Sequence, residues 1–103
     1  MGRSSPLYFY TYIIMINFEN IQKELTELYK KKNEDYGNSF EQSLNEYGLL
    51  PTIIRLKEKI ARADNIYVNN AAKIAEESIE DTLKDIANYC IITLTWLKNK
   101  KIN

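Results

Sequence analysis

The stretch IAEESIEDTLKDIANYCIITLTWLK, residues 74–98, decides the fold class of this chain. Apolar residues recur in it at intervals of three and four, which predicts one long amphipathic helix. Residues 89–97 are apolar on nearly every side, so we expect this part of the helix to be covered from several directions, inside a bundle or at a subunit interface. The predicted main apolar face consists of Ile79, Leu83, Ile86, Cys90, Leu94 and Leu97.

The same periodicity predicts three helices before this one. The first runs over residues 17–34. The second is a short helix that begins with a predicted capping box of Ser39 and Gln42 and that Gly48 ends. The third begins near Pro51 and runs to about residue 68. We therefore expect an all-α fold, a compact bundle of about four helices. The third helix should face the core with Ile53, Leu56, Ile60, Ala63 and Tyr67.

The N-terminal segment, residues 1–16, differs from this pattern. Its residues 7–16, LYFYTYIIMI, are a continuous apolar run about half as long as a membrane-spanning helix requires. Aromatic and β-branched side chains favour a strand, although no second strand-like run is present to pair with it. We therefore expect an N-terminal extension that is either strand-like or an arm for assembly with another subunit. An equally open alternative is that Met15 is the natural start and that residues 1–14 are not native.

Length and composition limit the classes of function. The 103 residues suffice for one domain, placed at residues 17–103. The 14 Lys and Arg balance the 14 Asp and Glu, so no membrane association is expected and direct nucleic-acid binding is not favoured. Because there is no His, Ser-His and Cys-His nucleophiles and imidazole zinc ligands are excluded. The single Cys permits no internal disulfide, which favours a cytoplasmic location.

Acidic residues form a stripe on the predicted last helix. Glu77, Asp81, Asp85 and Asn88 follow one another at intervals of four, four and three residues, which places them on one helix face. Carboxylates at this spacing repel each other. A divalent cation or a cationic partner would remove the repulsion, whereas the alternative is an ordinary solvated face.

Two further carboxylates, Glu24 and Glu27, lie three residues apart on the predicted first helix. If this helix packs against the last one, they converge with Asp81 and Asp85. Four carboxylates are suitable oxygen ligands for Mg²⁺. The alternative is that each set of carboxylates is an ordinary solvated helix face.

Basic residues occupy part of the predicted third helix. Arg55, Lys59 and Arg62 lie within roughly 60° of one another, opposite the apolar face of that helix. They could receive phosphate oxygens or form an ordinary solvated surface. Lys32 lies in the apolar arc of the first helix, so it either extends past the helix end or points inward to an anion.

Three strings resemble a known family: KKNEDYGNSF at 31–40, RLKEKIAR at 55–62 and ESIEDTLKDIANY at 77–89. They look like the nucleotide modification associated domain family, an all-α group common in phages and mobile elements and found near genes of nucleotide and DNA-base metabolism. The resemblance covers about residues 17–98 and implies a ligand site at the motif positions, in the host cytoplasm if the chain is phage-encoded. Those positions are Lys32, Asp35, Tyr36, Gly37, Arg55, Lys59, Arg62, Glu77, Ser78, Asp81, Thr82, Asp85, Asn88 and Tyr89.

A more distant likeness is to the MazG-like all-α NTP pyrophosphatases, whose magnesium site uses ExxE on one helix and ExxD on another. Glu24 and Glu27 match the first motif. The second motif is not matched, because Thr82 stands where the Glu paired with Asp85 would be. This resemblance implies Mg²⁺ as a candidate cofactor and leaves pyrophosphatase activity undecided.

Three functions stay open at this point. The first is binding of a (deoxy)nucleotide phosphate ligand, with magnesium-dependent hydrolysis as its enzymatic form. In that form Glu24, Glu27, Asp81 and Asp85 would hold the magnesium that activates water, while Lys59 and Arg62 would neutralise the phosphates. The second is sequestration, without chemistry, of a cyclic or dinucleotide signal of host defence. The third is an oligomeric helical scaffold. A homo-oligomer is expected, because a last helix that is apolar on several faces leaves more apolar surface than one small core hides.

Overall fold

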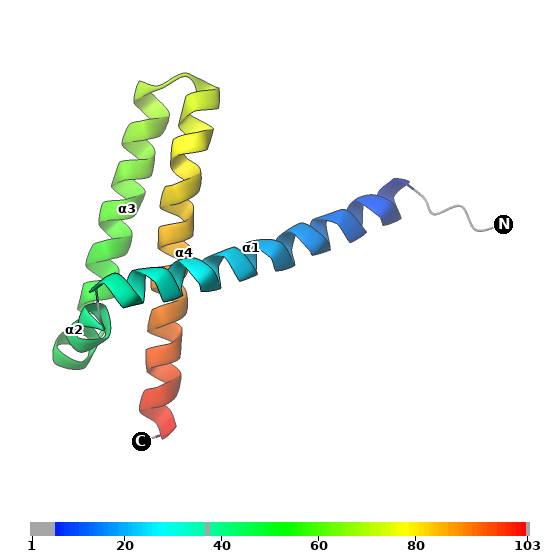
Figure 1. Cartoon of the computed structure of the whole chain (residues 1–103). Coiled ribbons are helices and arrows are strands. Elements are labelled where there is room, and N and C mark those ends of the chain that lie inside the picture. The colour runs from blue at the N-terminus through cyan, green and yellow to red at the C-terminus, as the bar shows by residue number, and fades with distance from the viewer. Residues whose placement is uncertain (1–5, 37, 103) are drawn as a thin grey trace. The chain divides into compact units, whose positions relative to one another are not determined.

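The computed structural model describes residues 6–36 and 38–102, apart from the side chains of residues 34–36 and 102. Within this part the chain is all-α, as predicted. It contains α1 (Pro6–Tyr36), α2 (Ser39–Tyr47), α3 (Leu50–Asn69) and α4 (Ala72–Ile102). The chain divides into two compact units, residues 1–35 and 36–103. The first unit is formed by α1 and the second by α2, α3 and α4 (Figure 1).

α1 shows that the strand interpretation of the N-terminal run was wrong. Residues 7–16 are helical and continue without a break into the helix predicted from residue 17. The described residues contain no strand, and a lone strand would leave its backbone groups without partners, whereas a helix satisfies them locally. Pro6 is the first helical residue, where its missing N–H costs nothing. The alternative role of this segment as an assembly arm stays a prediction.

None of the helices in the described part of the chain is long and apolar enough to span a membrane. The apolar run at the start of α1 is followed by the charged residues Glu19, Lys23 and Glu24 within the same helix. Charges at this spacing interrupt any continuous apolar stretch of the required length.

α2 ends at Gly48 as predicted, but Ser39 is its first helical residue and not the capping residue that the predicted capping box requires. Its N-cap is Asn38, whose carbonyl accepts a hydrogen bond from the Gln42 N–H at 3.0 Å. Gly48 ends the helix with φ +71°, a left-handed conformation that only glycine adopts without strain, and its N–H donates to the Leu44 carbonyl at 2.8 Å. Leu44 is fully buried and is the apolar anchor of this short helix.

α3 and α4 form an antiparallel hairpin (Figure 1). Asn70 and Ala71 alone connect them, with Asn70 in an extended conformation. Two side-chain amides satisfy the last carbonyls of α3: Asn69 Nδ2 donates to Asn65 O at 2.9 Å, and Asn70 Nδ2 donates to Ile66 O at 2.8 Å. The chain therefore reverses direction with little loss of backbone hydrogen bonding.

The contact line between the two hairpin helices is made of small and hydroxyl-bearing side chains. Thr52 of α3 is buried, as are Ala75, Thr82 and Thr93 of α4. The hydroxyl oxygens of Thr52 and Thr93 lie 2.7 Å apart, and Thr93 Oγ1 lies 2.7 Å from the Tyr89 carbonyl. Because the Thr93 hydroxyl donates its proton to that carbonyl, the Thr52 hydroxyl is the donor between the two threonines.

This contact line corrects the predicted core faces. Ile53, Ile60 and Tyr67 of α3 are 47%, 59% and 70% exposed, and Leu83 and Leu94 of α4 are 56% and 64% exposed. Small side chains let the helices meet along the threonine line, so the large apolar residues project to one side of it. The other predicted core residues are half-buried: Leu56, Ala63, Ile79, Ile86, Cys90 and Leu97.

Candidate functional site

One edge of the α3–α4 hairpin gathers basic residues from α3 and acidic residues from α4. The angle around each helix axis is measured from Thr52 on α3 and from Thr93 on α4, at about 100° per residue. By this measure the basic and the acidic residues lie on the same side of the hairpin. An ion pair between Lys59 and Asp85 fixes this relation. We call this surface the polar edge, and it consists of Arg55, Lys59, Arg62, Ser78, Asp81 and Asp85.

The Lys59–Asp85 pair is the central interaction of the polar edge. Lys59 Nζ lies 3.2 Å from Asp85 Oδ2, and both side chains are only 21% exposed. The sequence placed Lys59 on a basic face opposite the apolar side of its helix, whereas the structure places it at the interhelical contact. Since the pair is partly withdrawn from water, it is screened less than a surface pair and connects α3 to α4.

The two arginines of the polar edge differ in their contacts. Arg55 Nη1 lies 3.4 Å from Glu58 Oε2 in an exposed ion pair within α3. Arg62 is exposed and takes part in no hydrogen bond or ion pair within the described part of the chain. It lies one helical turn beyond Lys59. Arg62 is therefore the cation of this edge whose donors are open to an external anion.

α2 adds an aromatic contact at one end of the polar edge. Phe40 of α2 and Tyr89 of α4 meet edge to face, with ring centroids 4.9 Å apart and an interplanar angle of 63°. Tyr89 lies one turn beyond Asp85. Trp96 Nε1 donates to Asn45 Oδ1 at 2.8 Å and holds the other end of α2 against α4. The predicted ligand residue Tyr89 thus also has a packing role.

The remaining motif residues of α4 divide into buried and exposed side chains. Thr82 and Asn88 are buried, at 4% and 8% exposure, so they lie among packed side chains. Glu77, Ser78 and Asp81 are exposed. The predicted stripe is therefore divided: Glu77 and Asp81 are open to solvent, while Asp85 is half-buried and paired with Lys59. Its fourth member, Asn88, is buried.

The four predicted metal ligands come from both units. Glu24 and Glu27 are exposed residues of α1, while Asp81 and Asp85 belong to α4. Glu27 makes an exposed contact with Lys30 at 3.8 Å. Among the described residues, no three Asp, Glu or Cys side chains gather closely enough to hold a metal ion. The convergence of the four carboxylates stays a prediction.

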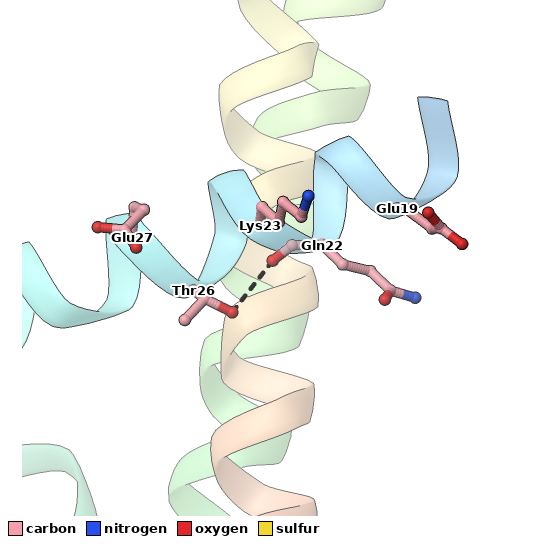
Figure 2. Close-up of a pocket in the computed structure, with 5 residues that line it drawn as sticks. All are labelled: Glu19, Gln22, Lys23, Thr26 and Glu27. Carbon is pink, nitrogen blue, oxygen red and sulfur yellow. Dashed lines mark hydrogen bonds between the residues drawn. The ribbon is translucent and has the colours of Figure 1, made fainter. Parts of the chain in front are cut away.

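A shallow hollow on α1 includes one of these carboxylates. It is lined by side chains at successive three- and four-residue intervals of that single helix (Figure 2). Thr26 Oγ1 donates to the Gln22 carbonyl at 3.1 Å, so this hydroxyl is engaged within the helix. A surface formed by one helix face cannot enclose a ligand, and it is not our candidate site. Its lining residues are Glu19, Gln22, Lys23, Thr26 and Glu27.

The first motif string lies around the end of α1. Lys32 is exposed. The side chains of Asp35 and Tyr36, and Gly37 as a whole, lie outside the described residues. The predicted roles of these positions in ligand binding stay predictions.

The family model described as nucleotide modification associated domain 1 matches residues 32–97. The chain belongs to this family. The matched span contains all of α2 and α3, most of α4, and every residue of the polar edge. No curated protein and no solved structure matches this member of the family. The more distant likeness to MazG-like pyrophosphatases stays an expectation.

Sequence reasoning about this nucleotide modification associated domain missed the partners of its site residues. It did not foresee that Asp85 pairs with Lys59 or that Phe40 contacts Tyr89. The hairpin register offers a usable signal, because the position numbers of facing residues add to nearly the same value in an antiparallel pair. Thr52 with Thr93 and Lys59 with Asp85 both obey this rule.

Proposed function

We propose that the polar edge binds the phosphate group of a (deoxy)nucleotide. The observation that most supports this is the arrangement of Lys59 and Arg62, one turn apart, with Lys59 neutralised by Asp85 and Arg62 without an ion pair in the described part of the chain. A guanidinium in this position offers two parallel N–H donors that match two phosphate oxygens. Membership of a nucleotide modification associated family agrees with this ligand class.

Neighbouring groups give the proposed site its other contacts. The Ser78 hydroxyl is exposed on the same edge and can donate to a phosphate oxygen. Tyr89, with Phe40 against it, offers an aromatic surface one turn beyond Asp85 on which a base can stack. Arg55 lies one turn before Lys59 and adds positive charge.

The acidic residues of the edge determine whether a metal is needed. Asp81 and Asp85 would repel a bare polyphosphate, and a divalent cation placed between carboxylate and phosphate would remove that repulsion. This favours a second candidate function, magnesium-dependent hydrolysis, in which these two residues act with Glu24 and Glu27 as ligands. When bound, Mg²⁺ would lower the pKa of a coordinated water and polarise the phosphoryl group.

The Lys59–Asp85 ion pair instead favours sequestration of a nucleotide without hydrolysis. Lys59 already neutralises Asp85, so part of the repulsion is removed without a metal. A protein that sequesters a cyclic or dinucleotide signal needs cationic and aromatic contacts but no activated water. The polar edge offers both kinds of contact.

A thermal-shift screen tests the proposal. The full chain is mixed with nucleoside mono-, di- and triphosphates, cyclic nucleotides and dinucleotides, each in magnesium and in EDTA, and the nucleotide is then analysed by chromatography. A ligand at about 100 times its dissociation constant adds roughly 2.7 kcal/mol to the folded state. Stabilisation in EDTA with intact ligand supports capture, while stabilisation and product only in magnesium support hydrolysis. No response to any nucleotide contradicts the proposal and favours the scaffold.

Two variants locate the site. Arg62→Ala should raise the dissociation constant at least about tenfold, since a charge-assisted hydrogen bond is worth about 1.5–3 kcal/mol. Lys73→Ala removes an exposed cation from the start of α4, away from the polar edge, and should leave binding unchanged. Equal losses in both variants would mean that overall charge, not the polar edge, attracts the ligand. Asp85→Asn should abolish turnover if hydrolysis occurs.

A further inference from the structure

The opposite side of the α3–α4 hairpin exposes large apolar side chains. Ile53, Ile60 and Tyr67 of α3 follow one another at seven-residue intervals and are 47%, 59% and 70% exposed. Leu83 and Leu94 of α4 are 56% and 64% exposed. We call these five residues the apolar edge.

Helix geometry separates this surface from the polar edge. Around the α3 axis, Ile60 lies roughly 80° from Thr52 in one direction and Arg62 roughly 80° in the other. A partner that covers the apolar edge therefore leaves the polar edge open. Association through the apolar edge therefore requires no nucleotide at the polar edge.

The exposed area is large for a chain of this size. The five side chains leave roughly 600 Å² of surface in water per chain, which is as large as the largest apolar patch on a typical monomer. Complete cover of these residues in two copies would remove about 1,200 Å² from water, which reaches the lower limit for stable protein interfaces. A second copy of the chain thus supplies sufficient area without any other partner.

The sequence of α3 is complementary to itself when two copies run antiparallel. With the two-fold axis at Ile60, this residue meets Ile60 of the partner subunit, and Ile53 lies opposite Tyr67 of the partner subunit. Lys57 then lies within one residue of the level of Asp64 of the partner subunit, and both are exposed on the outer flank of the apolar edge. The two-fold axis produces this opposite-charge contact twice.

We propose that two copies of the chain associate through their apolar edges, with the α3 helices antiparallel about a two-fold axis at Ile60. The apolar stripe supplies the buried area, and the reciprocal Lys57 and Asp64 contacts select the antiparallel direction. Each copy keeps its polar edge on the side away from the interface, so the dimer has two independent ligand surfaces.

The first test is the molar mass of the full chain in solution, by light scattering and by sedimentation over a concentration series. We expect 24 kDa or a multiple of it from a chain of 12.1 kDa. Ile60→Asp should raise the dimer dissociation constant at least about 30-fold, as expected for a central interface residue. Ile54→Asp is the matched control, because Ile54 is 45% exposed on the same helix but lies roughly 120° from Ile60.

A charge reversal tests the direction of the helices. Lys57→Glu and Asp64→Lys should each weaken the dimer, since each places like charges opposite one another. The double variant should restore association, because it reverses both partners of the contact. Cover of the apolar edge by α1 of the same chain would instead leave the mass unchanged in every variant.

A crosslink tests the position of the axis. In a Cys90→Ser background, Ile60→Cys should give a covalent dimer with a short bifunctional thiol reagent, and Ile54→Cys should not. A monomer at all concentrations, an Ile60→Asp variant of unchanged mass, or a double charge reversal that fails to restore association would each overturn the proposal. Restored association together with the position-specific crosslink would establish it.

Discussion

The two edges of the α3–α4 hairpin come from the same two helices, yet the side chains of one edge contact each other across the helices and those of the other edge are exposed. On the polar edge, Lys59 and Asp85 pair across the helices, and α2 contributes Phe40 against Tyr89. On the apolar edge, Ile60 and the other large side chains have water around much of their surface. The difference shows that the position of a helix contact is set by where side chains are small enough to let backbones approach, and not by where they are most apolar.

The largest loss of stability should come from truncating the buried anchor of α2. Leu44→Ala truncates a fully buried side chain, so the free energy of unfolding should fall by about 2–5 kcal/mol. Denaturant unfolding followed by the fluorescence of Trp96, which is hydrogen-bonded to α2, measures this loss. Leu50→Ala, at a site 58% exposed, is the control and should cost less than about 1 kcal/mol. Equal losses at the two sites would contradict the placement of α2.

Double-mutant cycles measure how much the half-buried ion pair of the polar edge differs in strength from an exposed one. Lys59→Ala and Asp85→Ala should show a coupling free energy of about 1 kcal/mol, because both side chains are only 21% exposed. The same cycle on Arg55 and Glu58, which are 52% and 58% exposed, should give no more than about 0.5 kcal/mol. Urea unfolding of the four variants of each cycle gives both values. Coupling that is stronger in the exposed pair would argue against the interhelical role of Lys59.

The contact line between the edges is tested by its two threonines. Thr52→Val removes one donor and should cost about 1 kcal/mol. Thr93→Val should cost more, because it removes the acceptor of the Thr52 hydroxyl as well as the bond from Thr93 to the Tyr89 carbonyl. Thermal unfolding of the two isosteric variants ranks them. The reverse order would mean that Thr93, not Thr52, donates between them.

A variant of Arg55 should change the stability least and distinguishes a role in ligand binding from a role in folding. Arg55→Ala removes an exposed side chain and should change the free energy of unfolding by less than about 0.5 kcal/mol. If the polar edge binds phosphate, the same variant should weaken nucleotide binding several-fold in titration calorimetry. Unchanged affinity would restrict the cationic part of the proposed site to Lys59 and Arg62.

Much of the architecture could be predicted from the sequence because it is local. The hydrophobic period identified α2, α3 and α4 with bounds close to those observed, and Gly48 marked the end of α2 correctly. The N-terminal run was misread because its composition suits both strand and helix. The choice depends on whether a second strand is available, which a single segment does not reveal.

The candidate site was harder to predict, because it depends on how two helices are rotated and aligned. Arg55, Lys59 and Arg62 share one side of α3, which a helical projection finds. That Lys59 reaches Asp85, 26 residues later, follows only once the Thr52–Thr93 contact fixes the register. An apolar stripe predicts only roughly which side of a helix faces its neighbour. In this hairpin the contact lies at the border of the apolar face, at Thr52 and Thr93, and not at its centre.

The connection between α3 and α4 has a consequence for how the chain folds. Because only Asn70 and Ala71 separate the helices, the closing loop is short and its entropic cost is small. Hairpins dominated by such near-neighbour contacts form on the order of microseconds to milliseconds. We expect α3 and α4 to form the folding nucleus, with contacts near the connection made first and the Thr52–Thr93 contact, furthest from it, made last. Both edges of the hairpin would then exist before the rest of the chain has folded.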